Sequence, residues 1–186
     1  MSISKTDILS VAGTLFSEQG YHGTTMREIA RACDVKDASL YSHIKSKEEI
    51  LWEIVSRSAH LFLAGARSVP QSLAIREQMK LLISGHLEVI ARDPQYATVF
   101  FGEWRVLAPE LRNEIKALRD TYEGYFQRVI EEGVRQGIFQ VTNTRLACLF
   151  VLSALNWTYQ WFDPQGPLSV EQLAVHYATF IVRALS

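Results

Sequence analysis

Two groups of residues have types and spacings that could do chemistry, and the first lies at residues 36–42. Its members stand at the start of a predicted short helix, 36–44, and are Lys36, Asp37, Ala38, Ser39 and Ser42. In the major groove of DNA, lysine donates to guanine and aspartate accepts from the cytosine amine. The N-terminal end of such a helix can therefore read base edges, although Asp37 could equally cap its own helix.

The second group is aromatic and lies in the later part of the chain. Large rings with polar tips suit an apolar pocket that orients its ligand by a few hydrogen bonds. We therefore predict a ligand-binding set consisting of His86, Phe100, Phe101, Trp104, Arg105, Tyr122, Tyr125, Phe126, Asn156, Trp157 and Trp161. A place in the hydrophobic core explains any single ring more simply, and for the cluster both interpretations stay open.

Catalytic and metal chemistry have little support. Cys33 and Cys148 lie far apart without a CxxC spacing, and the five histidines are scattered. The sequence contains no Ser-His-Asp signature, metal-spaced His/Cys cluster or phosphate loop. We therefore predict no catalytic residues, no metal, no cofactor and no enzymatic activity.

The elements that must position both groups are helices. Apolar residues recur at helical spacing along almost the whole chain, and no segment alternates as a strand does. Capping boxes at Thr25, Ser46 and Ser169 begin helices, and Gly20 stands where a helix ends. After a longer helix closed by Pro70, further helices are expected at 72–92, 94–107, 109–137, 144–162 and up to Leu185. The fold class is thus all-α, with about nine helices.

Composition limits the setting of this fold. The chain has 186 residues, of which 48% are hydrophobic and 21% charged, and its net charge is −1. Any nucleic-acid site must therefore be local, because the bulk charge gives it no support. Free cysteines and the absence of a signal peptide or membrane span predict a cytoplasmic protein.

Residues 5–52 resemble the N-terminal signature of the TetR family of repressors. The resemblance rests on the stretches 20–30 (GYHGTTMREIA) and 39–51 (SLYSHIKSKEEIL), with Val35 between them. It implies a helix-turn-helix domain at 1–52 that binds double-stranded DNA. It also implies phosphate contacts from Thr25, Tyr41, His43 and Lys47.

Three residues depart from the family pattern. Asp34 replaces the usual glycine of the turn, a position whose left-handed backbone aspartate tolerates. Lys36 replaces a common Ser/Thr cap, and Asp37 stands where lysine is frequent. Residues 1–50 contain six Lys and Arg against seven Asp and Glu, so we expect modest DNA affinity with a shallow salt dependence.

Residues 53–186 are predicted to form a ligand-binding and dimerisation domain. The stretches 100–105 (FFGEWR), 119–126 (RDTYEGYF) and 156–162 (NWTYQWF) resemble TetR regulators that respond to acyl-CoA thioesters of fatty-acid, phenylacetate or steroid catabolism. This resemblance implies an acyl-CoA effector. Arg105, Arg112 and Arg119 recur every seven residues and could hold its phosphates, although the interleaved acidic residues also fit a solvated, salt-bridged face.

The helices at 144–162 and at the C-terminus are apolar enough to pair with their symmetry mates in a homodimer. A two-fold dimer predicts a palindromic operator. Together these features predict a repressor that a small apolar effector releases from its operator. A helical adaptor that has lost DNA binding is the alternative, supported by Asp34, Asp37 and the nearly neutral N-terminal domain.

Overall fold

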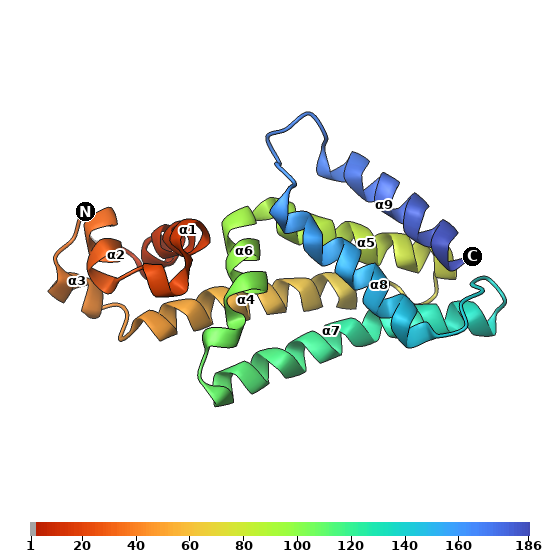
Figure 1. Ribbon diagram of the computed structural model, residues 1–186, viewed down its shortest axis with the longest axis horizontal. Coiled ribbons are helices and arrows are strands. Elements are labelled where there is room, and N and C mark those ends of the chain that lie inside the picture. Colours follow the sequence, from red (N-terminus) through yellow and green to blue (C-terminus); the bar gives the residue numbers. More distant parts are fainter. Residues whose placement is uncertain (1–2) are drawn as a thin grey trace. The chain divides into compact units, whose positions relative to one another are not determined.

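The computed structural model describes residues 3–186, and within this range it contains nine α-helices, two short 3-10 helices and no strand (Figure 1). The prediction of an all-α fold is therefore confirmed. The helices are α1 (Lys5–Gly23), α2 (Met26–Ala32), α3 (Asp37–Tyr41), α4 (Lys47–Arg67), α5 (Ile75–Arg92), α6 (Pro94–Gly102), η1 (Trp104–Val106), α7 (Pro109–Arg135), α8 (Thr144–Trp157), η2 (Thr158–Gln160) and α9 (Val170–Leu185).

Several predicted helices are shorter in the structure. The helix expected at 72–92 begins at Ile75, and the one expected at 109–137 ends at Arg135. The helix expected at 36–44 spans only α3, because Lys36 is its extended N-cap residue and residues 42 and 43 form a turn. The helix expected at 94–107 ends at Gly102 and continues as η1, and the one expected at 144–162 ends at Trp157 and continues as η2. Helix ends often tighten in this way, because 3-10 bonds satisfy carbonyls that the last α-helical turn leaves over.

Gly20 marks a break within α1. Its φ of 77° and ψ of 161° are non-helical, and residues 21–23 add one more helical turn after it. Residues with a side chain rarely adopt a positive φ, so glycine is the residue suited to this position. The predicted helix end at Gly20 thus corresponds to a kink, and α1 continues beyond it to Gly23.

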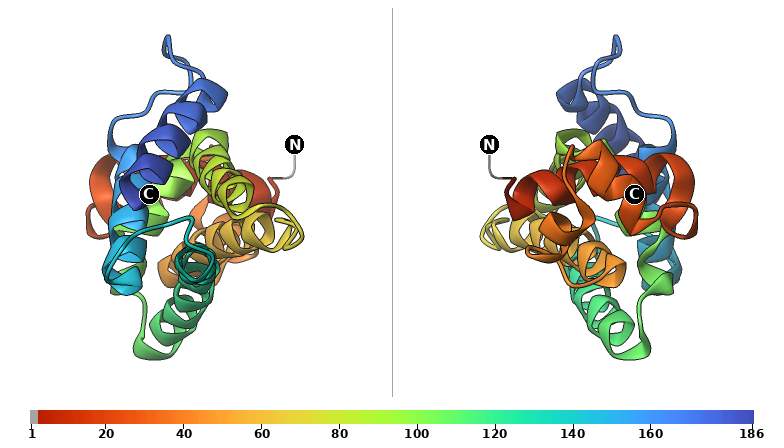
Figure 2. Two further views of the ribbon diagram at one scale, coloured as in Figure 1. Left: turned by 90° about the vertical axis from the view of Figure 1, so that its right-hand side faces the viewer. Right: turned by 90° about the vertical axis from the view of Figure 1, so that its left-hand side faces the viewer.

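The chain forms two compact units, of which the first comprises residues up to Ala59 together with 94–116. Its core includes residues that are almost fully buried: Ile8, Phe16, Ile29, Leu40, Ile44, Ile50 and Ile54. The helices α1, α2 and α3, coloured red to orange, face the viewer in the right-hand view of Figure 2. The structure therefore groups α6 and η1 with the N-terminal helices, and the predicted division between residues 52 and 53 stays a prediction.

The second unit comprises residues 60–93 and 117–186. Helices α5, α8 and α9 pack together in it, with the buried side of α7 (Figure 1). Its core contains Met79, Ile83, Phe126, Ile130, Val151, Leu155 and Ile181. Among the described residues, no helix is both long and apolar enough to cross a membrane.

Candidate DNA-binding surface and effector site

The turn between α2 and α3 depends on Asp34. This residue has a φ of 54°, the only positive value outside glycine among residues 3–186. Its N–H donates to the carbonyl of Arg31 at 3.0 Å, and the N–H of Val35 donates to that of Ala30 at 3.0 Å. Aspartate tolerates this backbone region better than most residues, so the expectation that the turn survives without glycine is confirmed.

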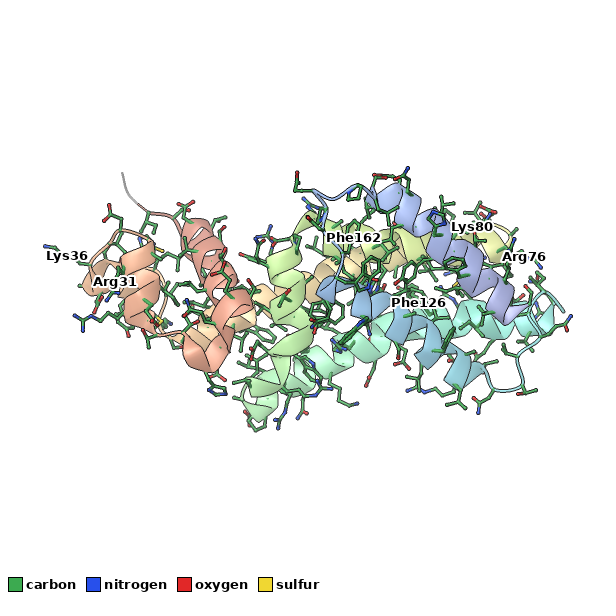
Figure 3. All side chains as sticks on the ribbon, turned by 45° about the horizontal axis from the view of Figure 1, so that its top comes forward. Arg31, Lys36, Arg76, Lys80, Phe126 and Phe162 are labelled. Carbon is green, nitrogen blue, oxygen red and sulfur yellow. The ribbon has the colours of Figure 1, made fainter. Side chains whose placement is uncertain are left out.

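The segment after this turn presents a row of exposed polar side chains. Leu40 and Ile44 are fully buried and anchor it. All of the predicted base-reading residues are exposed, as are Tyr41 and His43. Figure 3 shows the Lys36 side chain extending outward at the end of the N-terminal unit, and it makes no capping bond to α3. The segment therefore presents these side chains to solvent.

Thr25 begins α2 with a complete capping box. Its hydroxyl accepts from the N–H of Glu28 at 3.2 Å, and the Glu28 carboxylate accepts from the N–H of Thr25 at 2.7 Å. Hydrogen bonds from the Thr25 side chain and backbone lower the pKa of Glu28, so this carboxylate is charged at neutral pH. A phosphate at the start of α2 would have to displace or approach that charge.

Lys47 makes contacts inside the protein. Its ammonium donates to the carbonyls of Tyr21 at 2.8 Å and Thr24 at 2.6 Å, and lies 4.3 Å from the centroid of the Tyr21 ring. These bonds use two of its three N–H donors. Lys47 therefore fastens the start of α4 to the end of α1, and its predicted phosphate contact would use the remaining donor.

The C-terminal unit brings three predicted ligand residues together. His86 Nδ1 lies 2.9 Å from Tyr122 Oη, and the Tyr122 ring centroid lies 5.5 Å from that of Phe126. Phe62 of α4, which the prediction omitted, completes the cluster with its ring centroid 4.8 Å from that of His86. In sequence Phe62 is one more apolar residue of a helix face, and only the approach of α4 to α5 and α7 reveals its neighbours.

Burial dominates the electrostatics of this cluster. It lowers the pKa of His86 to about 3, an effect that the charge of Arg119 reinforces and a hydrogen bond with the Leu155 backbone partly opposes. Burial also raises the pKa of Tyr122. Both groups are therefore neutral at physiological pH, which suits a ligand held by hydrogen bonds rather than by charge.

The other predicted ligand residues lie in different surroundings. Trp157 and Trp161 are 63% and 49% exposed, so the structure does not place them in the cluster. The guanidinium of Arg128 lies over the Tyr125 ring, 5.1 Å from its centroid, and Asn156 is half-buried. Four further members belong to the N-terminal unit: Phe100, Phe101, Trp104 and Arg105.

The arginine series also divides. Arg119 is half-buried and close enough to influence His86, whereas Arg112 is exposed and donates to the Arg105 carbonyl at 3.3 Å. A single stripe of phosphate-binding arginines therefore does not form along α7. An open groove of about 390 Å³ near the α5 C-terminus is lined by Phe162 and Arg92 among others, and by none of the predicted ligand residues.

Helices α8 and α9 each expose large apolar side chains. Large side chains are exposed there: Leu146, Leu149, Phe150, Trp157, Val175 and Phe180. The opposite sides of both helices are buried, through Val151 and Leu155 in α8 and Ile181 in α9. We call these six residues the α8–α9 face.

Metal-ligand chemistry has no cluster to support it, since residues 3–186 contain no group of three or more His, Cys, Asp or Glu side chains able to hold an ion.

Two models of known protein families match this chain. Residues 8–54 match the family model described as bacterial regulatory proteins, tetR family, and residues 72–185 match the one described as tetracyclin repressor-like, C-terminal domain. The transcriptional repressor KstR2 of Rhodococcus jostii is 28% identical over 185 residues, which cover 98% of this chain and 91% of the relative.

Two solved structures are similar over nearly their whole length. The TetR-family regulator PfmR of Thermus thermophilus has a TM-score of 0.88 and 33% identity, covering 96% of this chain and 98% of its own. AibR, solved in complex with isovaleryl coenzyme A and operator DNA, has a TM-score of 0.83 and 28% identity, covering 95% and 96%. The chain belongs to the TetR family of bacterial transcriptional regulators.

Proposed function

We propose that this regulator is a cytoplasmic repressor that binds a palindromic operator as a homodimer and leaves it when an acyl-CoA thioester binds. The observation that carries the DNA-binding part is the exposed polar row of α3 over the buried Leu40 and Ile44, within the region that matches the tetR family. An exposed, well-anchored recognition helix is what major-groove reading requires.

Recognition would divide between base reading and backbone positioning. Lys36, at the extended N-cap of α3, and Asp37, at its first position, would reach base edges. Thr25, Tyr41, His43 and Lys47 would contact phosphates and fix the register. Tyr41, with 52% of its surface exposed, can offer its hydroxyl without rearrangement.

The effector class follows from the relatives and from the chemistry of the cluster. AibR binds isovaleryl coenzyme A, and the relatives include the KstR2 repressor. The aromatic rings around His86 and Tyr122 offer an apolar environment with two neutral hydrogen-bonding groups. A thioester, with an apolar acyl chain and one polar carbonyl, matches that environment. The proposal requires no cofactor besides the effector.

Release would be a population shift. A thioester that binds one arrangement of the body more tightly than another favours that arrangement, and operator affinity falls if it spaces the two recognition helices wrongly. The thioester need only bind the two arrangements with different affinities. The factor by which it lowers the affinity for the operator is then the factor by which bound operator lowers the affinity for the thioester.

Substitutions at the N-cap and at the last residue of α3 test the DNA-binding surface. Lys36→Ala and Tyr41→Phe should each lower the affinity for a genomic fragment selected by the wild-type protein by about tenfold, as lost base or phosphate contacts do. Both side chains are exposed, so the melting temperature should stay within about two degrees of wild type. Fluorescence anisotropy and thermal denaturation measure these effects.

Lys80→Ala is the matched control. It removes the same charge from an exposed lysine of α5, whose ion pair with Glu77 is local. It should leave operator affinity unchanged. Wild-type affinity in both α3 variants would show that α3 is not the recognition helix.

A further inference from the structure

Residues 20–24 form the joint between α1 and α2, and a carboxylate from a distant part of the chain accepts a hydrogen bond from its backbone. Because Gly20 breaks the helix, the Tyr21 N–H lies at the start of a new turn, and it donates to Glu103 Oε1 at 3.2 Å. Glu103 lies 82 positions later in sequence, between α6 and η1. Its side chain makes no capping bond to η1, although it directly precedes that helix. Glu103 thus caps a turn of α1 instead of its own helix.

Lys47 holds the same joint from the other side. Its bonds to the carbonyls of Tyr21 and Thr24 complement the acceptor that Glu103 provides. Thr24 is fully buried, and its hydroxyl donates to the Gly20 carbonyl at 3.0 Å. Backbone groups of the joint are therefore bonded to side chains of α4 and of the α6–η1 connection, and the joint leads directly into α2.

A second carboxylate completes the link. Glu48, next to Lys47 at the start of α4, accepts from the N–H of Ala108 at 2.7 Å. Ala108 follows η1, so η1 is tied at one end to α1 through Glu103 and at the other to α4 through Glu48. All of these contacts lie within the N-terminal unit.

The close approach of α1 to α6 makes the coupling stiff. A Cβ atom at Gly13 would lie 2.6 Å from Tyr96 Cε1, so the ring packs directly on the backbone of α1. Packed elements of this kind move together rather than deforming continuously. A displacement of α6 and η1 would therefore reach α1.

We propose that Glu103 is a positioning residue through which a displacement of η1 turns the α2–α3 pair. The inference rests on the proposed function, in which an effector changes the arrangement of the protein. The predicted effector residues Phe100, Trp104 and Arg105 are close neighbours of Glu103 in sequence. An effector that displaces η1 would move Glu103, and with it the Tyr21 amide and the start of α2. Operator release is then a consequence of that movement.

Hydrogen exchange tests the mechanical part without any effector or DNA. In Glu103→Ala, amide exchange should rise about tenfold, and the rise should extend from Tyr21 through α2 and α3 while residues 75–92 keep the wild-type rate. Glu103→Gln, which retains an acceptor oxygen, should be intermediate. Glu114→Ala, at an exposed carboxylate of α7, is the control and should match wild type. A rise confined to Tyr21 would overturn the proposal, since the bond would then be only a local cap.

Operator binding tests the regulatory part, with isovaleryl and palmitoyl coenzyme A as probes. The ratio of operator affinities without and with the effective probe should fall about tenfold in Glu103→Ala, while direct calorimetry finds the same probe affinity in DNA-free protein. If Glu103→Ala lowers the melting temperature but leaves the ratio of operator affinities unchanged, Glu103 only stabilises the fold, and the proposal is overturned. If wild-type protein itself binds no operator, the proposed function fails, and the exchange pattern still decides whether Glu103 positions α2 and α3.

Discussion

Replacement of Phe150 by aspartate is expected to turn the protein into monomers and to lower operator affinity at least about 100-fold. A dimer engages two half-sites, and the second contact is effectively intramolecular, which commonly contributes a factor of about 100 or more. A monomer keeps only one recognition helix on the DNA. Neither Lys36→Ala nor Tyr41→Phe should affect DNA binding as strongly, because each removes only one contact per half-site and leaves the dimer intact.

The physical reason is the α8–α9 face. Leu146, Phe150 and Trp157 follow one side of α8 at helical spacing, and Phe150 is 58% exposed. Val175 and Phe180 extend the apolar surface onto α9. So many large exposed apolar side chains are rare on monomers and indicate an interface, and a buried, unpaired aspartate there is strongly unfavourable. We expect the two-fold pairing of α8 and α9 to cover this face.

Sedimentation equilibrium and operator titration measure the effect together. Thr142→Asp, which places the same charge on an exposed loop residue, should remain dimeric. Because Phe150 is exposed in the single chain, its replacement should leave the helical content intact. A Phe150→Asp protein that stays dimeric with wild-type operator affinity would exclude α8 as the dimer interface.

Acidification from pH 7 to pH 5 is expected to lower the free energy of unfolding by about 2 kcal/mol through His86 alone. The pKa of this histidine falls to about 3 in the folded protein, mainly because it is buried, whereas an unfolded histidine has a pKa near 6.5. The unfolded state therefore binds a proton over this range and the folded state does not. Stability is present above pH 6.5 and is lost progressively as the pH falls towards 3.

The chosen pH window separates His86 from the carboxylates. Glu28 and Glu49 also have lowered pKa values, through hydrogen bonds with Thr25 and Lys45, but their contribution is lost only below about pH 4.5. Urea denaturation at pH 7 and pH 5 should show the difference in wild type and a much smaller one in His86→Gln. His22→Gln, at an exposed position, should behave as wild type. An equal pH dependence in wild type and His86→Gln would contradict the neutral, buried state of His86.

Local features of the fold could be predicted because neighbouring residues encode them. The capping boxes at Thr25 and Ser169 and the left-handed Asp34 follow from residues within four positions, and the structure confirms each. Gly20 was predicted to end its helix, whereas it forms a kink after which α1 continues to Gly23. The helical endings at 102 and 157 were less predictable, since both α and 3-10 continuations satisfy the same apolar pattern.

Long-range contacts of the candidate sites could not be predicted in the same way. Phe62 meets His86 and Glu103 meets Tyr21 only because helices distant in sequence pack together. Trp157 carried no sequence signal to tell an exposed apolar face from a ligand pocket, because both need aromatic residues. The ligand and DNA contacts of individual residues therefore remain proposals, for which the substitutions above are the tests.

One measurement tests the central claim most directly: fluorescence anisotropy of the wild-type protein on DNA from genomic selection, titrated with acyl-CoA thioesters from isovaleryl to palmitoyl coenzyme A. We predict specific binding to a palindromic fragment that one class of thioester reverses and free coenzyme A does not. Specific binding that no thioester alters would contradict the acyl-CoA effector. Binding no tighter than that of a scrambled fragment would contradict the repressor itself and favour a helical adaptor.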